Sequence, residues 1–153
     1  MTVNNVIVGH VIERKDVVGF NLLDKEACIV ICGYFGSDPK CRDNKLINSV
    51  AAGCPFAGIV HPGHECGESA KNVHFIGNVA HSVEGCGAHI FPNAASAKTQ
   101  DLCYEGSHFA AYKNTQLGLA THFITREIIM TNMTMIDNVL GINLQTAGDN
   151  LKQ

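Results

Sequence analysis

The sequence predicts an all-β protein, a right-handed parallel β-helix (a solenoid) of about five coils with loop insertions. Three observations predict this fold class. Short strand segments that begin with glycine recur along the chain, and an asparagine precedes each of the last four of those glycines. In addition, no long segment combines apolar residues at helical spacing with a credible cap, so long helices are not expected.

The glycine-led segments are residues 19–22, 58–61, 87–90, 118–121 and 141–144. Side chains in a strand alternate between two faces, so the first and third residues after each glycine form two inward columns. Eight of these ten residues are apolar, against two of the five residues between them. The inward columns are Phe20, Ile59, Ala88, Leu119 and Ile142, and Leu22, His61, Ile90, Thr121 and Leu144; the outward column is Asn21, Val60, His89, Ala120 and Asn143. We expect Asp in place of Ile90 or Ile142 to unfold the protein by burying an unpaired charge.

The asparagines before the glycines are expected to form one column that bonds from coil to coil. They are Asn48, Asn78, Asn114 and Asn138. Successive glycines lie 39, 29, 31 and 23 residues apart, and a coil needs about two dozen residues. The longer intervals therefore predict insertions near residues 32–43, 61–72 and 93–106. The alternative is an antiparallel β-sandwich, which the fixed order of Asn then Gly and the lack of Asn-Gly or Asp-Gly hairpin turns disfavour.

Composition limits the function classes. The chain has 153 residues, a net charge of −3, 46% apolar residues and 16% charged residues, which fits one folded domain, residues 1–153. The charge disfavours a strongly basic nucleic-acid binder and a polybasic membrane-surface protein. No run of 18 apolar residues predicts a membrane segment in this chain, and the first residues do not resemble a signal peptide.

Two stretches go beyond a generic β-helix. Residues 48–61 read Asn-Ser-Val-Ala-Ala-Gly-Cys-Pro-Phe-Ala-Gly-Ile-Val-His, and residues 77–92 begin Gly-Asn-Val-Ala-His-Ser. With residues 111–119 and 135–143, they resemble the parallel β-helix (PbH1) repeat region of fibrocystin and fibrocystin-L. The same superfamily contains cell-surface hyaluronan-degrading proteins. The resemblance covers roughly residues 44–143 and implies an extracellular or cell-surface module of a larger membrane protein, so we expect this chain to be a fragment of a longer solenoid.

Seven cysteines raise the question of redox state. Cys32 and Cys41 can close the loop between them, and the resemblance implies a bridge between Cys66 and Cys103. Such bridges each contribute about 2–4 kcal/mol. The other three cysteines have apolar or glycine-rich surroundings, which suggests that they are small buried residues. They are Cys28, Cys54 and Cys86. The alternative is a cytosolic protein with all seven cysteines reduced.

Several histidines are candidate site residues. His61, His64 and Cys66 have the ligand types and local spacing of a zinc site, but the second ligand pair of a structural site is missing. A buried core histidine is the simpler interpretation of His61. His89 and His122 point outward on neighbouring coils and are candidate binding residues, because imidazoles on one face can form a ligand-binding or pH-sensitive patch. A plain solvated face is the alternative.

Catalytic signals are weak. Known β-helix polysaccharide enzymes use clustered acids or a calcium site, and the acids here are scattered along the sequence. Glu84 with His81 is the best acid–base pair. Asn132-Met-Thr134 is an N-glycosylation sequon. We therefore expect a non-catalytic module that presents loops to a protein or glycan ligand, with no cofactor and no nucleic-acid partner. The alternative is a glycan-processing β-helix of the hyaluronan-degrading kind.

Overall fold

The computed structural model describes residues 2–3, 6–8, 27–31, 45–61, 64–65, 75–90, 102–124 and 127–146. Within these residues the chain forms three sheets, whose strands stack in chain order and pair in parallel. The exception is β7 (His64–Glu65), which pairs antiparallel with β11. The prediction of a parallel β-helix is confirmed.

Each coil contributes one strand to each sheet. Sheet A contains β1 (Thr2–Val3), β4 (Lys45–Ile47), β8 (Phe75–Ile76), β11 (Leu102–Ser107) and β14 (Glu127–Thr131), and β7 joins it at β11. Sheet B contains β2 (Val6–Val8), β5 (Val50–Ala52), β9 (Val79–His81), β12 (Ala110–Tyr112) and β15 (Thr134–Ile136). Sheet C contains β3 (Ala27–Val30), β6 (Ala57–His61), β10 (Cys86–Ile90), β13 (Leu117–Ile124) and β16 (Leu140–Thr146).

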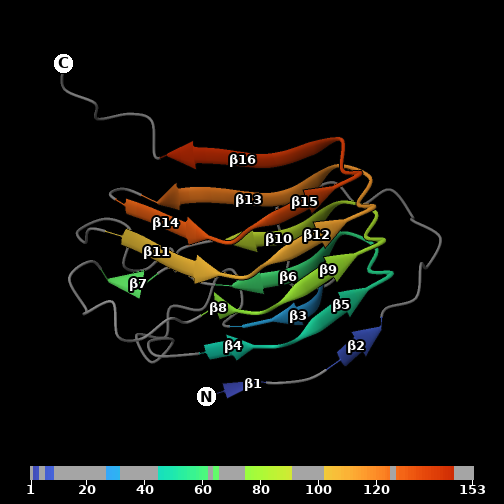
Figure 1. Ribbon diagram of the computed structural model, residues 1–153, viewed down its shortest axis with the longest axis horizontal. Helices are drawn as coiled ribbons and strands as arrows, with labels where there is room; N and C mark the ends of the chain where they lie inside the picture. The colour runs from blue at the N-terminus through green and yellow to red at the C-terminus, as the bar shows by residue number, and fades with distance from the viewer. Residues whose placement is uncertain are drawn as a thin grey trace.

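The strands define five coils, numbered here from the N-terminal end. In Figure 1 the chain crosses the front of the molecule from left to right through sheets A and B, returns behind them through sheet C, and rises toward the C-terminus. The coils therefore wind right-handed, as expected for parallel crossovers. Coil 5, formed by β14, β15 and β16, lies at the upper end of the stack (Figure 1).

The register of sheet C agrees with the glycine-led alignment in four coils. Ala88 pairs with Ile59 on one side and Leu119 on the other, and Leu119 pairs with Ile142. Residues 19–22 lie outside the described residues, and the coil 1 strand in this sheet is β3, in which Ile29 pairs with Ile59. The glycine-led pattern therefore does not mark the first coil of sheet C.

The glycines that begin these strands leave room for the neighbouring backbone. A Cβ on Gly58 would lie 2.6 Å from the carbonyl oxygen of Gly87, and one on Gly87 would lie 2.6 Å from that of Gly118. Both separations are shorter than any real contact of a Cβ. The recurring glycine is thus required by the close approach of successive coils at the entry to sheet C.

In coils 2 to 4 the inward columns form the core, as predicted, whereas Ile142 and Leu144 of coil 5 are exposed and Phe20 and Leu22 lie outside the described residues. Ile59, Ala88, Leu119 and Ile90 are fully buried. The outward column is also buried, because Val60, His89 and Ala120 are only 2%, 8% and 3% exposed. Sheet C therefore has two buried faces in coils 2 to 4, and the expected solvated outer face is not present there. A parallel sheet buried on both sides carries near-continuous apolar runs. Only two of the five outward residues are apolar, so the sequence did not indicate that this side is covered.

The four asparagines do not form one column. Each coil turns first between sheets A and B and a second time between sheets B and C. Asn48 lies in the first turn of coil 2, with a φ of 49° and an exposed side chain. Asn78 is buried in the corresponding turn of coil 3, where its Oδ1 accepts from Ser49 N and its Nδ2 donates to Leu46 O. Asn114 and Asn138 lie in the second turn of coils 4 and 5 and bond to each other. The single-column prediction was wrong because each coil has two turns, and both favour asparagine.

A disulfide joins Cys28 in β3 to Cys54 in the turn between β5 and β6, 26 residues apart in sequence. The interpretation of these two cysteines as unpaired small core residues was therefore wrong. Cys54 is indeed buried, and the same reasoning is confirmed for Cys86, which is a buried free thiol. Nothing in the sequence near Cys28 indicates its partner, because the two come together only when coils 1 and 2 stack.

Candidate binding surface on sheet B

The outer side of sheet B carries a parallel ring pair. His81 ends β9 and Tyr112 ends β12, and the register of the sheet places them opposite each other. The ring centroids are 4.7 Å apart and the ring planes differ by 3°. This separation matches the spacing between paired strands, so the coil stacking itself holds the two half-buried rings face to face.

Polar or charged side chains follow this column in the second turn, between sheets B and C, of coils 3 to 5. Ser82, Lys113 and Asp137 all have positive φ, which directs the exposed side chains away from the core. His81 Nδ1 lies 3.2 Å from Ser82 Oγ. Within the described residues, neither Lys113 nor Asp137 forms an ion pair, so both charges are accessible to a ligand.

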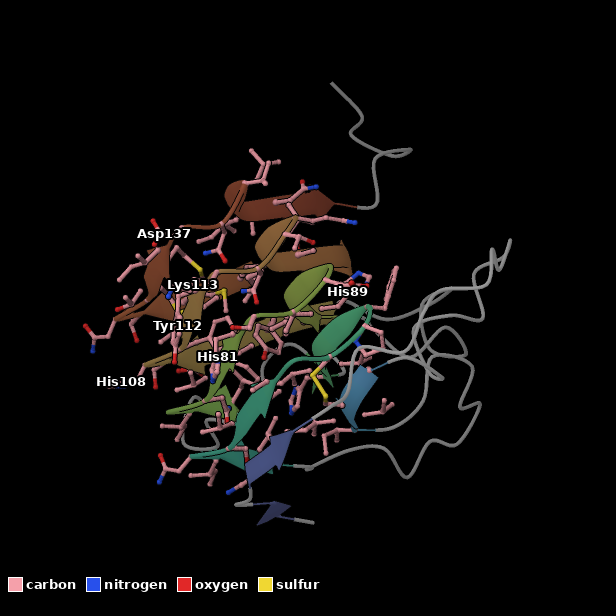
Figure 2. The ribbon with its side chains drawn as sticks, turned by 90° about the vertical axis from the view of Figure 1, so that its right-hand side faces the viewer. His81, His89, His108, Tyr112, Lys113 and Asp137 are labelled. Atoms are coloured by element: carbon pink, nitrogen blue, oxygen red, sulfur yellow. A yellow bond between two sulfur atoms is a disulfide. The ribbon has the colours of Figure 1, made fainter. Side chains whose placement is uncertain are left out.

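His108 and Asn132 lie in the first turn of coils 4 and 5, with φ values of 55° and 53°. Asn132 Nδ2 lies 3.0 Å from His108 Nε2. Figure 2 shows His108 on the same side of the molecule as His81, Tyr112, Lys113 and Asp137, whereas His89 lies on the opposite side. We call these five residues the sheet B surface: His81, His108, Tyr112, Lys113 and Asp137.

Four of these five residues were not identified from the sequence as candidates. A signal was available, because Tyr112 follows His81 by 31 residues, which is also the interval between Gly87 and Gly118. A residue one coil interval away occupies the same column, so a search for chemistry-bearing residues at coil spacing finds the ring pair.

The predicted binding pair of histidines is not an exposed patch. His89 is buried on the outer side of sheet C, where it pairs with Val60 and Ala120. His122 lies two residues beyond Ala120 in β13, and its side chain is outside the described part of the structure. The register therefore does not place the two histidines opposite each other.

The structure places the two residues of the weak catalytic pair on different elements. His81 lies on the outer side of sheet B, whereas Glu84 lies in the turn after it and uses its backbone carbonyl to accept a hydrogen bond from Thr115 Oγ1. Among the described residues, no hydrogen bond or ion pair connects the Glu84 carboxylate to His81. General acid–base work needs both groups within reach of one reacting atom.

His61 is a core residue. It is 1% exposed, and its ring lies edge-on to Phe75 and Tyr104, with centroids 5.5 Å and 5.8 Å away. The side chain of His64 and all of Cys66 fall outside the described residues, so the zinc prediction is tested only in part. No group of three metal-binding side chains occurs in the described ranges. The side chains of Cys32, Cys41, Cys66 and Cys103 also lie outside the described residues, and their pairing stays a prediction.

None of the protein-family models, curated proteins or solved structures compared with this chain matches it. In the ranges that the structure describes, no helix is long and apolar enough to cross a membrane. The Cys28–Cys54 disulfide indicates an oxidising environment, because disulfides persist there and are rare in the cytosol. Fold and covalent chemistry together define a disulfide-containing parallel β-helix protein.

Proposed function

We propose that this chain is a non-catalytic extracellular or cell-surface β-helix module, similar to the repeat region of the fibrocystins, that binds a protein or glycan ligand. The observation that carries the proposal is the ring pair of His81 and Tyr112 beside the exposed Lys113 and Asp137. Tyrosine provides large contact area together with a polar group, and it is enriched in binding surfaces.

The stacking of the rings also supports binding. Successive strands hold each ring parallel to the other, so a ligand meets side chains that are already ordered. Ordering a side chain on association costs about 0.5–1.5 kcal/mol. Because folding already orders these two rings, most of this entropy is not lost again on binding. Lys113 and Asp137 supply charges of both signs within one turn column, which can fix the orientation of a polar ligand.

Binding to intact cells tests the proposal. The full chain, made through a secretory route, is added to cells before and after protease treatment and before and after hyaluronidase treatment. We expect binding that is lost after one of the two treatments, which identifies a protein or a glycan ligand. Tyr112→Ala and His81→Ala should each weaken binding at least about tenfold, and Ile129→Ala, on the outer side of sheet A, should not.

Two results contradict the proposal. The first is that the folded wild-type protein shows no saturable binding. The second is that Tyr112→Ala and Ile129→Ala weaken binding equally. The size of hyaluronan incubated with the protein is measured in parallel. A decrease in chain length would favour the glycan-processing alternative over the non-catalytic module.

The sequon at Asn132 provides a separate test of export. Asn132 is exposed in the first turn of coil 5, and Thr134 is exposed at the start of β15. We expect the protein secreted from animal cells to carry an N-glycan at Asn132, seen as a mass decrease after enzymatic deglycosylation. Asn132→Gln and Thr134→Ala should both remove it, and Asn143→Gln should not. Secreted protein without a glycan would contradict this assignment.

A further inference from the structure

The turn residues with positive φ in coils 2 to 4 all donate their backbone N–H groups toward the C-terminal end of the stack, whereas neighbouring residues such as Val79 and Ala110 donate toward the N-terminal end. The residue with positive φ in each turn donates its N–H to a carbonyl of the next coil. These bonds are Asn48 N to Ile76 O, Gly77 N to Ser107 O and His108 N to Thr131 O in the first turn, and Gly53 N to His81 O, Ser82 N to Tyr112 O and Lys113 N to Ile136 O in the second. The equivalent donors of coil 5 are the N–H groups of Asn132 and Asp137. Neither has an acceptor among the described residues.

Asparagine side chains in the second turn accept hydrogen bonds in the same direction. Val83 N donates to Asn114 Oδ1, and Asn114 N donates to Asn138 Oδ1, at 3.0 Å and 3.2 Å. In each case an asparagine of the next coil accepts from the turn below it. Asn138 N occupies the corresponding position in coil 5 and has no such acceptor in the described ranges.

The apolar columns of sheet C also lose their cover at coil 5. Leu119 and Thr121 of coil 4 are fully buried, whereas their partners Ile142 and Leu144 are 44% and 56% exposed. Leu140, opposite Leu117, is 55% exposed. The other end of the stack differs, because Ile29 and Ile31 at β3 are only 4% and 6% exposed. In sheet C the described apolar side chains of coil 1 are therefore covered, whereas coil 5 presents exposed aliphatic side chains, and none of the described residues pairs with the far edges of β14, β15 and β16.

We propose that the coil 5 end face, formed by β14, β15 and β16, binds a further parallel β-coil from a partner β-helix segment. The geometry specifies this occupant. Its backbone must supply carbonyls to the N–H groups of Asn132 and Asp137, a side-chain oxygen to Asn138 N, and aliphatic side chains over Ile142 and Leu144. Only a strand–turn–strand–turn–strand segment running parallel to coil 5 meets these requirements together.

The covered apolar residues of coil 1 in sheet C disfavour head-to-tail stacking of unmodified copies. Such stacking would require the first coil of a second copy to offer an open edge with accessible apolar positions, and Ile29 and Ile31 are covered. The inference does not depend on the proposed ligand, because the end face uses the backbone N–H of Asp137, whereas the sheet B surface uses its side chain.

The test adds a further coil to the full chain. A copy of residues 127–146 is appended after Gln153, so that residues 147–153 serve as the connection. The amide hydrogen exchange of Asn132, Asp137 and Asn138 is then compared with that of the unextended protein. We expect exchange in the extended protein to slow by at least about a hundredfold, and its melting temperature to rise. The unextended protein should exchange these amides rapidly.

Matched variants locate the effect. Ile142→Lys in the receiving coil should abolish the added protection, whereas Ile129→Lys in the same coil, which lies on the outer side of sheet A, should keep it. Protection of the three amides in the unextended monomer would overturn the proposal, because the chain's own residues would then cover the face. Concentration-dependent protection with a doubled mass would overturn it in favour of a second copy. A folded extended protein without added protection would also overturn it.

Discussion

The Nδ2 group of Asn114 donates a hydrogen bond to Oδ1 of Asn138, 2.9 Å away in the next coil. The same Asn138 oxygen accepts from Asn114 N, and Asn138 Nδ2 donates to Ala111 O. Asn114 makes the equivalent contacts to coil 3 through Val83 N and Ala80 O. Asn114 and Asn138 therefore each form hydrogen bonds with backbone groups of the coil below. This asparagine ladder takes the place of backbone pairing where the chain turns from sheet B to sheet C.

Replacing Asn114 by alanine should lower the free energy of unfolding by about 2–4 kcal/mol, because it leaves the buried Val83 N and the Ala80 carbonyl without their partner. Urea denaturation followed by circular dichroism measures the loss. Asn48→Gly is the control. Asn48 is exposed with a φ of 49°, a conformation that glycine accepts readily, so the change there should stay below about 0.5 kcal/mol. Equal losses at the two positions would contradict the role of the buried ladder.

Aspartate substitutions should separate the middle of the stack from its end. Ile90 is fully buried, so Ile90→Asp places an unpaired charge between coils and should prevent folding. Ile142 is 44% exposed, so an aspartate there can reach water and should leave a folded protein with a lower melting temperature. This corrects the expectation that both substitutions unfold the chain. Thermal melts and solubility of both variants provide the check, and a soluble, cooperatively melting Ile90→Asp protein would contradict the register.

Alkaline pH should destabilise the protein. Burial raises the pKa of the Cys86 thiol from 9.0 to about 12, and it raises the pKa of the Tyr104 hydroxyl well above 10.0. At a pH between the unfolded and the folded pKa of each group, the unfolded chain loses a proton that the folded chain keeps. Stability is therefore fully present below about pH 9 and falls toward pH 12, by up to about 1.4 kcal/mol per pH unit for each group. Urea midpoints at about pH 8 and about pH 10.5 measure the effect.

Cys86→Ala is the control for this pH dependence. It removes one of the two shifted groups, so its stability should decrease less steeply with pH than that of the wild type. A stability that is constant over this range, or identical slopes for the two proteins, would contradict the assignment of the buried thiol.

The Cys28–Cys54 disulfide should be recovered by peptide mapping without reduction. Breaking it with Cys28→Ala or Cys54→Ala should cost about 2–4 kcal/mol of unfolding free energy. The double variant should cost no more than the larger single loss, because both substitutions remove one bond. The same digest tests the Cys66–Cys103 and Cys32–Cys41 predictions. Seven free thiols in a folded secreted protein would contradict the disulfide and weaken the extracellular proposal.

Local sequence pattern predicted the parts of the fold that repeat. Alternating residues after each glycine identified the strands of sheet C in coils 2 to 5, and the inward column correctly placed His61 in the core. The pattern did not identify β3, because coil 1 begins sheet C with Cys28 at the position of Gly58. It also did not separate the two asparagine-containing turns, since the residues on either side of each turn look alike in sequence.

The candidate site depended on contacts between coils. The sequence drew attention to histidines, and it identified His81, but it paired this residue with the neighbouring Glu84 rather than with Tyr112, 31 residues away. His89 appeared to be an exposed binding residue because strand alternation fixes which side of a sheet a residue lies on. Alternation does not determine whether that side is covered, and at His89 it is.

The sequence by itself determined the solenoid, its glycine-led strands and most of its core, because these follow from periods of two residues within a strand and about two dozen along the chain. Only the tertiary structure decided the pairing of Cys28 with Cys54, the stacking of His81 on Tyr112, the burial of His89 and the exposure of Ile142 and Leu144 in coil 5. Each of these depends on which residues of different coils become neighbours. That relationship is set by the lengths of the insertions and the register of the sheets, which local pattern does not encode.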